Sequence, residues 1–170
     1  MKFNINQIFD YPVEVIEEAL FMDENIGEFL VTEMPSLLQL EKIEIVKEEN
    51  TVKRRIRYLP KPLITKVGPK KIPPEAMEWI ENSTYEIKTH KLSYNNIPTH
   101  PRIGKMFSNS GEIVLIPRGN QTERIISGVL KIHVPIFGAI AERIIFKTAK
   151  TVLEEEAQAL IKYIEKKQTK

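Results

Sequence analysis

The sequence predicts an α+β protein in which a single antiparallel β-sheet packs against one long C-terminal helix. Apolar side chains recur at the helical period from about residue 138 to residue 166, which makes about 40 Å of helix at about 1.5 Å per residue. Between residues 40 and 134 the chain instead repeats short segments of alternating apolar and polar side chains, separated by turn residues. The sheet and the helix each have an apolar face to bury, so we expect those two faces to pack together.

The N-terminal part predicts a strand followed by two short helices. Residues 2–9 alternate apolar and polar side chains, as a half-buried strand does. Pro12 then suits the first turn of a helix, and acidic residues follow it near the positive end of the helix dipole. A second short helix is expected over residues 23–32, because its apolar residues fit one buried face and Pro35 ends it.

The next segments predict a β-hairpin. Residues 40–48 and 51–60 both alternate in polarity, and Glu49–Asn50 between them fits a turn. The alternation places every second residue of the second strand on one face: Val52, Arg54, Ile56 and Tyr58.

The rest of the sheet is expected after a long loop. Residues 60–74 contain five prolines and Gly68, which predicts the loop, and residues 76–80 predict a short helix. The remaining strands and turns are expected at the following positions: strands at 84–94, 104–116 and 122–134, and turns at 95–96 and 118–120.

Composition excludes several classes of chemistry. The 170 residues suit one domain over residues 1–170, with residues 167–170 frayed. Cysteine is absent, so disulfides, thiolate catalysis and cysteine zinc sites are excluded. The histidines have no metal-ligand spacing, so neither a metal nor a cofactor is expected.

The charge and hydropathy patterns bear on partners and location. A net charge of +2 argues against a general nucleic-acid binder, although a local basic patch remains open. The N-terminal residues have no apolar core of signal-peptide length, and no window resembles a membrane span. We therefore expect a soluble cytoplasmic protein, with peripheral membrane contact as an open alternative.

The last third of the chain carries the most specific pattern, with Pro135, Gly138 and Glu142 as fixed points: GEIVLIPRGNQTERIISGVLKIHVPIFGAIAERIIFKTAKTVLEEEAQALIKYI. This pattern, together with the order of elements over the whole chain, resembles the START-like superfamily, also called helix-grip or SRPBCC. Within it, the pattern is similar to the family called domain of unknown function 2505. PRELI-type lipid-transfer domains have a similar layout.

The resemblance implies a helix-grip fold, in which a curved antiparallel sheet wraps around the long C-terminal helix. It also implies a cavity for an apolar small molecule, often a lipid or a polyketide. Some START-like proteins are cyclases or hydrolases, but their catalytic residues vary. No catalytic residue can therefore be assigned to this chain through the resemblance.

Glu156 is the most unusual residue of the predicted long helix, because it falls within the apolar stripe. A carboxylate there is costly unless it is paired or hydrogen-bonded. One interpretation is a cavity carboxylate that holds a polar group of the ligand or transfers a proton. The interpretation we favour is a structural ion pair, with Arg54 as the expected partner. The two interpretations are compatible if the pair lines the cavity.

A ligand site is expected where the sheet faces the long helix. Trp79, the only tryptophan, could close the mouth of the cavity, although a lone tryptophan more often belongs to the core. The predicted ligand-binding residues are Arg54, Ile56, Tyr58, Trp79, Ile145, Val152 and Glu156.

Residues 51–74 contain eight basic residues and no acidic one, with aliphatic side chains between them. Such a segment suits contact with an anionic membrane. It also fits a phosphate-bearing ligand, nucleic acid, or a solvated surface. The predicted membrane-contact residues are Lys61, Leu63, Ile64, Lys66, Lys70 and Lys71.

Three functions remain open from the sequence. The leading hypothesis is a noncatalytic protein that binds or transfers an apolar ligand, plausibly a lipid. The second is a cyclase-type or hydrolase-type enzyme that uses Glu156 with Tyr58 or His90. The third is an interaction module with a filled core, which would leave no cavity large enough for a ligand.

Overall fold

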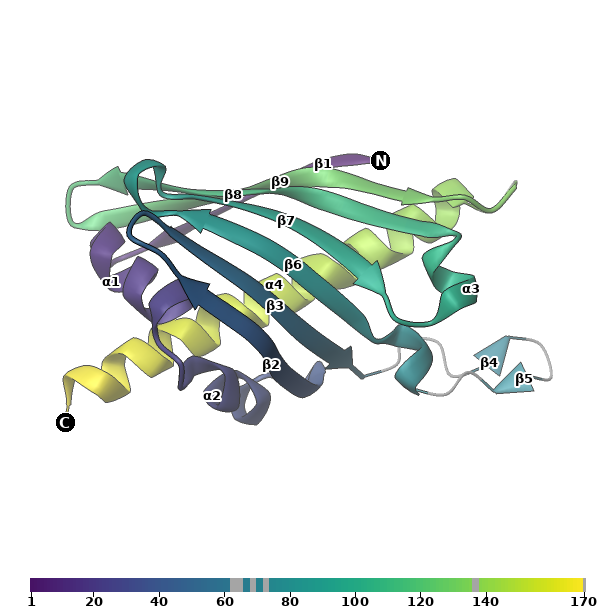
Figure 1. The fold of residues 1–170 in the computed structure, drawn as a ribbon, viewed down its shortest axis with the longest axis horizontal. Helices are drawn as coiled ribbons and strands as arrows, with labels where there is room; N and C mark the ends of the chain where they lie inside the picture. The colour runs from purple at the N-terminus through teal and green to yellow at the C-terminus, as the bar shows by residue number, and fades with distance from the viewer. Residues whose placement is uncertain (62–65, 68–69, 72–73, 136–137, 170) are drawn as a thin grey trace.

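The computed structural model describes residues 1–61, 66–67, 70–71, 74–135 and 138–169. An antiparallel sheet of seven strands lies across one long helix in this part of the chain, with the order β1-β9-β8-β7-β6-β3-β2 (Figure 1). The strands are β1 (Lys2–Phe9), β2 (Leu37–Lys47), β3 (Thr51–Pro60), β6 (Trp79–Glu86), β7 (Lys91–Pro98), β8 (Phe107–Arg118) and β9 (Gln121–Ile132), with a separate hairpin of β4 (Lys66–Val67) and β5 (Lys70–Lys71).

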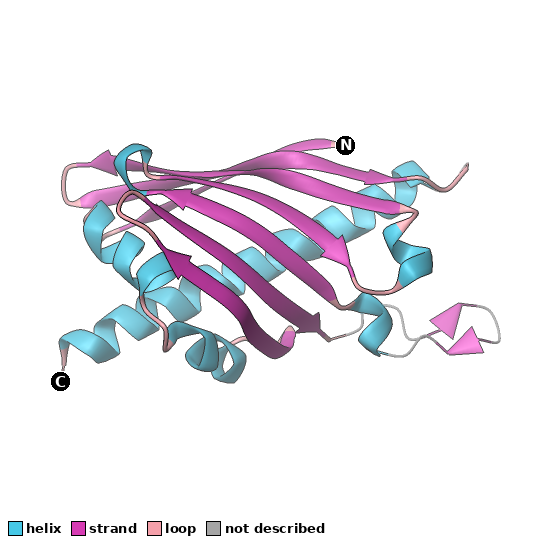
Figure 2. Cartoon of the chain, in the orientation of Figure 1, coloured by secondary structure: helices cyan, strands magenta, loops and turns pink. Residues whose placement is uncertain are grey.

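The long helix and the helices near the N-terminus lie on one face of the sheet, and the remaining short helices lie at the ends of strands (Figure 2). The helices are α1 (Val13–Glu17), the π-helical turn η1 (Glu18–Met22), α2 (Ile26–Glu33), the 3₁₀ turns η2 (Pro74–Met77) and η3 (Ile87–Thr89), α3 (Pro101–Gly104) and α4 (Gly138–Gln168). The predicted α+β helix-grip architecture, with two short helical segments after the first strand, is therefore confirmed.

Several predicted element boundaries are wrong. The strand expected at 84–94 is two strands, β6 and β7, because η3 and His90 turn the chain between them. His90 has a left-handed backbone with φ of 52°, a conformation that the sequence did not signal with glycine or asparagine. Asn95 and Asn96 are not a turn but pair with Ser110 and Asn109 inside the sheet.

The short helix expected at 76–80 is also displaced. Its place is taken by the 3₁₀ turn η2, after which Trp79 and Ile80 already belong to β6. The loop expected at 60–74 contains the β4–β5 hairpin, and its remaining central residues lie outside the described ranges.

The main core lies at one end of the sandwich. The C-terminal half of α4 packs there against α1, η1, α2 and the inner face of the sheet, which we define as the face toward α4. Its buried residues include Ala159, Leu160, Tyr163 and Ile164. In contrast, none of residues 139–158 of α4 is fully buried, so the first half of the helix lies more loosely over the sheet.

Candidate functional site

A cavity of about 70 Å³ lies between the inner face of the sheet, the η1–α2 segment and α4. Apolar side chains from the short helices and the sheet form much of its wall, and charged side chains from several strands and from α4 also line it. The lining residues used below are Arg54, Ile56, Tyr58, Glu81, Arg124 and Glu156.

β-strand register brings the polar side chains to this place. Arg54 on β3 pairs with Ser83 on β6, and Ser83 pairs with Tyr94 on β7. Glu81, two residues before Ser83, points to the same face, because side chains alternate along a strand. The inner face therefore has a polar centre within its apolar surroundings.

The Arg54 guanidinium contacts four groups. Its Nη2 lies 3.2 Å from Glu81 Oε1, and its Nη1 donates to the Leu20 carbonyl over 3.0 Å. Its Nε donates to Ser83 Oγ over 3.3 Å, and the guanidinium lies over the Phe21 ring. These contacts neutralise a mostly buried cation and fix η1 against the sheet.

Glu156 pairs with Arg124 of β9, so the predicted Glu156–Arg54 pair is wrong. The Glu156 Oε2 and Arg124 Nη1 atoms are 2.9 Å apart. Arg124 is only 1% exposed, and its Nε donates to Gln7 Oε1 over 2.8 Å while its guanidinium lies over the Phe9 ring. Both Arg54 and Arg124 lie on the inner face. Arg54 already has Glu81 beside it, whereas Arg124 meets the carboxylate of α4.

Two polar groups of the cavity have no hydrogen bond to the described residues. Glu156 Oε2 is buried and close to Arg124, but the contact lacks the alignment of a hydrogen bond. The Tyr58 hydroxyl also lacks a partner among the described side chains. Burial raises the pKa of Tyr58 well above its usual value, and the negative charge of Glu81 raises it further. Tyr58 is therefore protonated at neutral pH and can donate a hydrogen bond.

The other predicted ligand residues lie outside the cavity wall. Trp79 lies beside Tyr58 on the neighbouring strand, and the two rings stack with their centroids 5.3 Å apart. Trp79 therefore contacts a cavity residue without lining the cavity itself. Val152 packs at the margin of the core, and Ile145 is half-buried on the looser half of α4. Four of the seven predicted residues thus line the cavity: Arg54, Ile56, Tyr58 and Glu156.

Arg124 and Glu81 are two charged cavity residues among those that sequence reasoning missed. Arg124 alternates with Thr122 and Ile126, and this pattern could have placed it on the inner face. Glu81 had no such signal, because its strand was expected to begin only at residue 84.

His90 belongs to a different cluster. Its Nδ1 lies 3.1 Å from Glu17 Oε1, and the Tyr85 hydroxyl donates a hydrogen bond to the same carboxylate. Burial and this carboxylate raise the pKa of Tyr85 above its usual value. The cluster connects α1 with the β6–β7 turn and does not line the cavity, so it does not supply the predicted partner for Glu156.

The predicted membrane-contact residues are only partly described. Lys61 is exposed. The backbones of Lys66, Lys70 and Lys71 form the β4–β5 hairpin. Leu63 and Ile64 lie outside the described residues, so their contribution stays a prediction.

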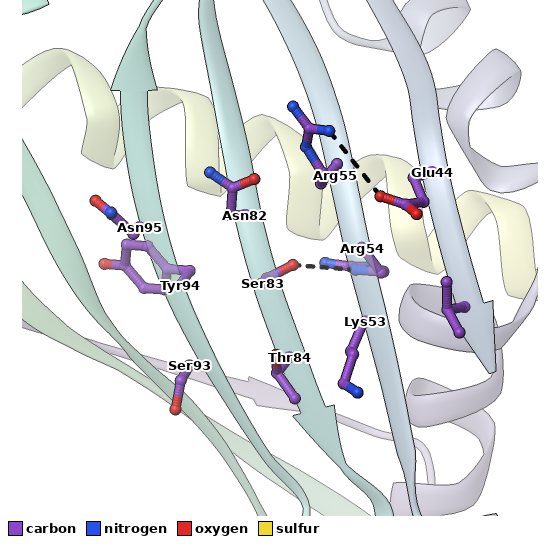
Figure 3. Close-up of a pocket in the computed structure, with 11 residues that line it drawn as sticks. Glu44, Lys53, Arg54, Arg55, Asn82, Ser83, Thr84, Ser93, Tyr94 and Asn95 are labelled. Atoms are coloured by element: carbon purple, nitrogen blue, oxygen red, sulfur yellow. Dashed lines mark hydrogen bonds and ion pairs between the residues drawn. The ribbon is translucent and has the colours of Figure 1, made fainter. Parts of the chain in front are cut away.

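A larger hollow of about 440 Å³ lies on the outer face of the sheet. Figure 3 shows it with α4 behind the strands, and its walls include Asn82, Thr84, Ser93 and Asn95. A weak ion pair, 4.0 Å long, joins Arg55 and Glu44 at its side. Ligand sites are usually concave and apolar with a few placed polar groups, so the inner cavity is the better candidate despite its smaller volume.

Two further searches bear on ligands and membranes. No group of histidine, aspartate and glutamate side chains in the described part of the chain could hold a metal ion. None of the helices that the structure describes is long and apolar enough to cross a bilayer.

The sequence matches no model of a known protein family, and no curated protein is significantly similar to it. Solved structures, however, share the fold. TTHA0849 from Thermus thermophilus aligns with a TM-score of 0.66 at 16% identity, covering 96% of this chain and 97% of that protein. The Zhui aromatase/cyclase from Streptomyces sp. R1128 has a TM-score of 0.59 at 13% identity and covers 97% and 93% of the two chains.

A START superfamily protein from Mycobacterium smegmatis has a TM-score of 0.57 at 11% identity and covers 97% of both chains. At such low identities the similarity establishes the fold alone. Seven antiparallel strands around a long C-terminal helix, matched over nearly the full length of these proteins, give this chain the START-like helix-grip fold.

Proposed function

We propose that the protein binds a small, mainly apolar molecule in the cavity between the sheet and α4. One observation carries the proposal: Glu156 Oε2 is buried without a hydrogen bond to described residues and lines a largely apolar cavity. The Tyr58 side chain lines the same cavity. Buried polar groups are normally satisfied, and exceptions often mark a place where a ligand or water binds.

The two groups also indicate the chemistry of the ligand. Tyr58 is protonated and can donate a hydrogen bond, whereas an ionised Glu156 can only accept one. A hydroxyl group can accept from the first and donate to the second. The proposed ligand is therefore an apolar molecule that carries a hydroxyl, such as a sterol-like or polyketide-like alcohol or a hydroxylated lipid chain.

The cavity is smaller than a typical ligand pocket, so it must expand when a ligand binds. Typical ligand pockets measure about 300–1,000 Å³, several times more than this cavity. The first half of α4 is the element best suited to move, because none of its residues from 139 to 158 is fully buried. Displacement of residues 139–158 would open the space beside Glu156 while the residues from Ala159 onward stay anchored in the core.

We also propose the family assignment that the sequence suggests, on the contacts at the start of α4. In the Pro135–Gly138–Glu142 pattern, a Cβ at Gly138 would lie 2.4 Å from the Ile132 carbonyl oxygen, so only glycine fits. The Glu142 carboxylate accepts from the Ile132 N–H over 3.0 Å. These contacts fix the start of α4 around the residues on which the resemblance to domain of unknown function 2505 rests. Membership of that family is part of the proposal.

Native mass spectrometry of the protein purified without detergent, followed by solvent extraction, tests for a bound molecule. The companion assay adds hydroxylated and non-hydroxylated pairs of sterols and fatty acids and follows thermal stabilisation. We expect stabilisation by the hydroxylated member of a pair, reduced at least tenfold in apparent affinity in Tyr58→Phe. Tyr11→Phe, a tyrosine outside the cavity, is the matched control.

Three outcomes would contradict the proposal in different ways. No extracted molecule and no stabilisation by any compound would favour an interaction module with a filled core. Binding unchanged by Tyr58→Phe and Glu156→Gln would place the ligand elsewhere. Conversion of a bound compound, detected as a product of different mass, would favour the enzyme hypothesis.

A further inference from the structure

The first three turns of α4 present an apolar and basic face to solvent. Ile140 and Ile144 are 56% and 52% exposed, a large fraction for isoleucine. Arg143 and Lys147 are exposed as well. These four residues follow the spacing i, i+3, i+4 and i+7, so they share one face of the helix. The face mixes aliphatic side chains with cations and packs against no other described element.

The segment that precedes β8 extends this face. The His133 N–H donates to the Met106 carbonyl over 2.7 Å, which holds the α3–β8 connection beside the end of β9. Arg102, Lys105 and Met106 are exposed there, as is Lys131 on β9. We call these residues, together with the four on α4, the basic–apolar end. Figure 1 shows α3, the start of α4 and the β4–β5 hairpin at the same end of the long axis.

The cations of this end are not neutralised by the fold. Arg102, Lys105, Lys131, Arg143 and Lys147 form no ion pair within the described part of the chain. The neighbouring carboxylate, Glu142, is engaged by the Ile132 N–H and the Met1 amine. These hydrogen bonds lower the pKa of Glu142, which keeps it ionised and bound.

The opposite end of the molecule has the opposite charge. Residues 3–41 contain nine acidic residues and no lysine or arginine. They include α1 and α2, which lie at the far end of the long axis from α3 (Figure 1). Lys162 and Lys167 of α4 neutralise part of this acidity through Glu33 and Asp23. Lys47 and Lys166 also lie at this acidic segment, through Glu24 and the Phe29 ring, so the segment is acidic but partly neutralised.

We propose that the basic–apolar end docks onto an anionic lipid bilayer. Exposed cations are attracted to acidic headgroups, and isoleucines on the same helical face can enter the boundary between headgroups and acyl chains. The acidic end then points away from the membrane. This proposal is independent of what the inner cavity binds.

Other occupants fit the surface less well. A second copy of the chain in a two-fold contact through this end would set one cationic surface against an identical cationic surface. Nucleic acid would engage the cations but would leave two protruding isoleucines in contact with a phosphate backbone. A bilayer is the partner that satisfies both kinds of side chain.

Vesicle flotation tests the proposal, with vesicles of phosphatidylcholine alone and of phosphatidylcholine mixed with phosphatidylglycerol. We expect the protein to float only with the phosphatidylglycerol vesicles and to be released by salt. Arg143→Glu/Lys147→Glu should weaken binding at least roughly tenfold, since each near-surface cation contributes about a fivefold change in affinity. Ile140→Ser/Ile144→Ser should weaken binding without altering net charge.

Lys53→Glu/Lys88→Glu is the matched control, because it makes the same change in net charge on exposed residues away from this end. It should bind nearly as the wild type does, and thermal unfolding should show that all variants are folded. Absence of flotation, or equal loss in the control, would overturn the proposal. So would a dimer broken by Ile140→Ser/Ile144→Ser, or duplex DNA binding lost in Arg143→Glu/Lys147→Glu without any vesicle binding.

Discussion

The Arg124 guanidinium of β9 and the Glu156 carboxylate of α4 lie 2.9 Å apart and join the sheet to the helix. Because Arg124 is almost fully buried, removing Glu156 leaves a cation without its partner. We expect Glu156→Leu to lower the free energy of unfolding by about 3 kcal/mol in urea titrations at neutral pH. The double variant Arg124→Met/Glu156→Leu should lose less than the two single variants together. Additive losses would show that the pair is not coupled.

Two glycines make room for Tyr94 in the middle of the sheet. The Tyr94 hydroxyl lies 2.7 Å and 2.9 Å from the positions that a Cβ would take at Gly111 and Gly128. A Cβ at Gly111 would also lie 2.0 Å from the Ser127 carbonyl oxygen. Gly111→Ala should therefore lower the free energy of unfolding by about 1–3 kcal/mol.

The control for this prediction is Gly104→Ala in α3, where the nearest neighbour of a Cβ is the Pro98 carbonyl oxygen at 3.4 Å. Its unfolding free energy should stay within about 0.5 kcal/mol of the wild type. If Gly111→Ala were equally neutral in chemical denaturation, the close packing of Tyr94 across the two strands would be wrong.

Asp23 predicts an acid-sensitive contact between η1 and the end of α4. Burial alone would raise the pKa of Asp23, but hydrogen bonds from Lys167, the Asn25 N–H and Tyr163 lower it below its usual value. The resulting stability is present above the unfolded pKa, near 3.8, and is lost as pH falls toward the lower folded pKa.

Asp23→Asn should consequently be less stable than wild type at neutral pH. Its unfolding free energy should also decline less steeply below about pH 4, where the unfolded aspartate takes up its proton. Urea titrations over this acidic range compare the two proteins. Parallel pH profiles would indicate that Asp23 does not titrate differently in the folded state.

Tyr94 should make the stability of the fold depend on pH in the alkaline range. Burial, and then the charge of Glu81, raise the pKa of Tyr94 to about 12. A raised folded pKa contributes stability below the unfolded value of about 10, and this contribution is lost as pH rises toward 12. Tyr94→Phe should thus reduce, but not abolish, the loss of stability above pH 10, because Tyr58 and Tyr85 act in the same direction. Unfolding titrations across that pH interval measure the difference.

Polarity patterns were sufficient for the architecture but not for every boundary. The first hairpin, the turn around Gly119 and the long helix all carry strong local signals, and the structure contains them. The β6–β7 connection carries none, because it turns at His90 in a left-handed conformation that surrounding contacts stabilise. Asn95 and Asn96 look like turn residues, yet pairing with β8 keeps them extended.

The candidate site shows the same division between local and long-range information. Alternation alone places Arg54, Ile56 and Tyr58 on the inner face, and the helical period places Glu156 opposite them. The choice between Arg54 and Arg124 as partner of Glu156 depends on the order of strands in the sheet. Hydrogen bonding between strands sets that order, and no periodicity within one strand encodes it.

The acidic α1–α2 segment and the basic–apolar end together give the molecule an electric dipole along its long axis. The field of an anionic surface would exert a torque on this dipole and turn the basic end toward the surface before contact. Such orientation raises the association rate and fades as added salt shortens the range of the field. Burial of Ile140 and Ile144 would instead slow departure. Charge separation would thus control how fast the protein arrives, and the isoleucines how long it stays.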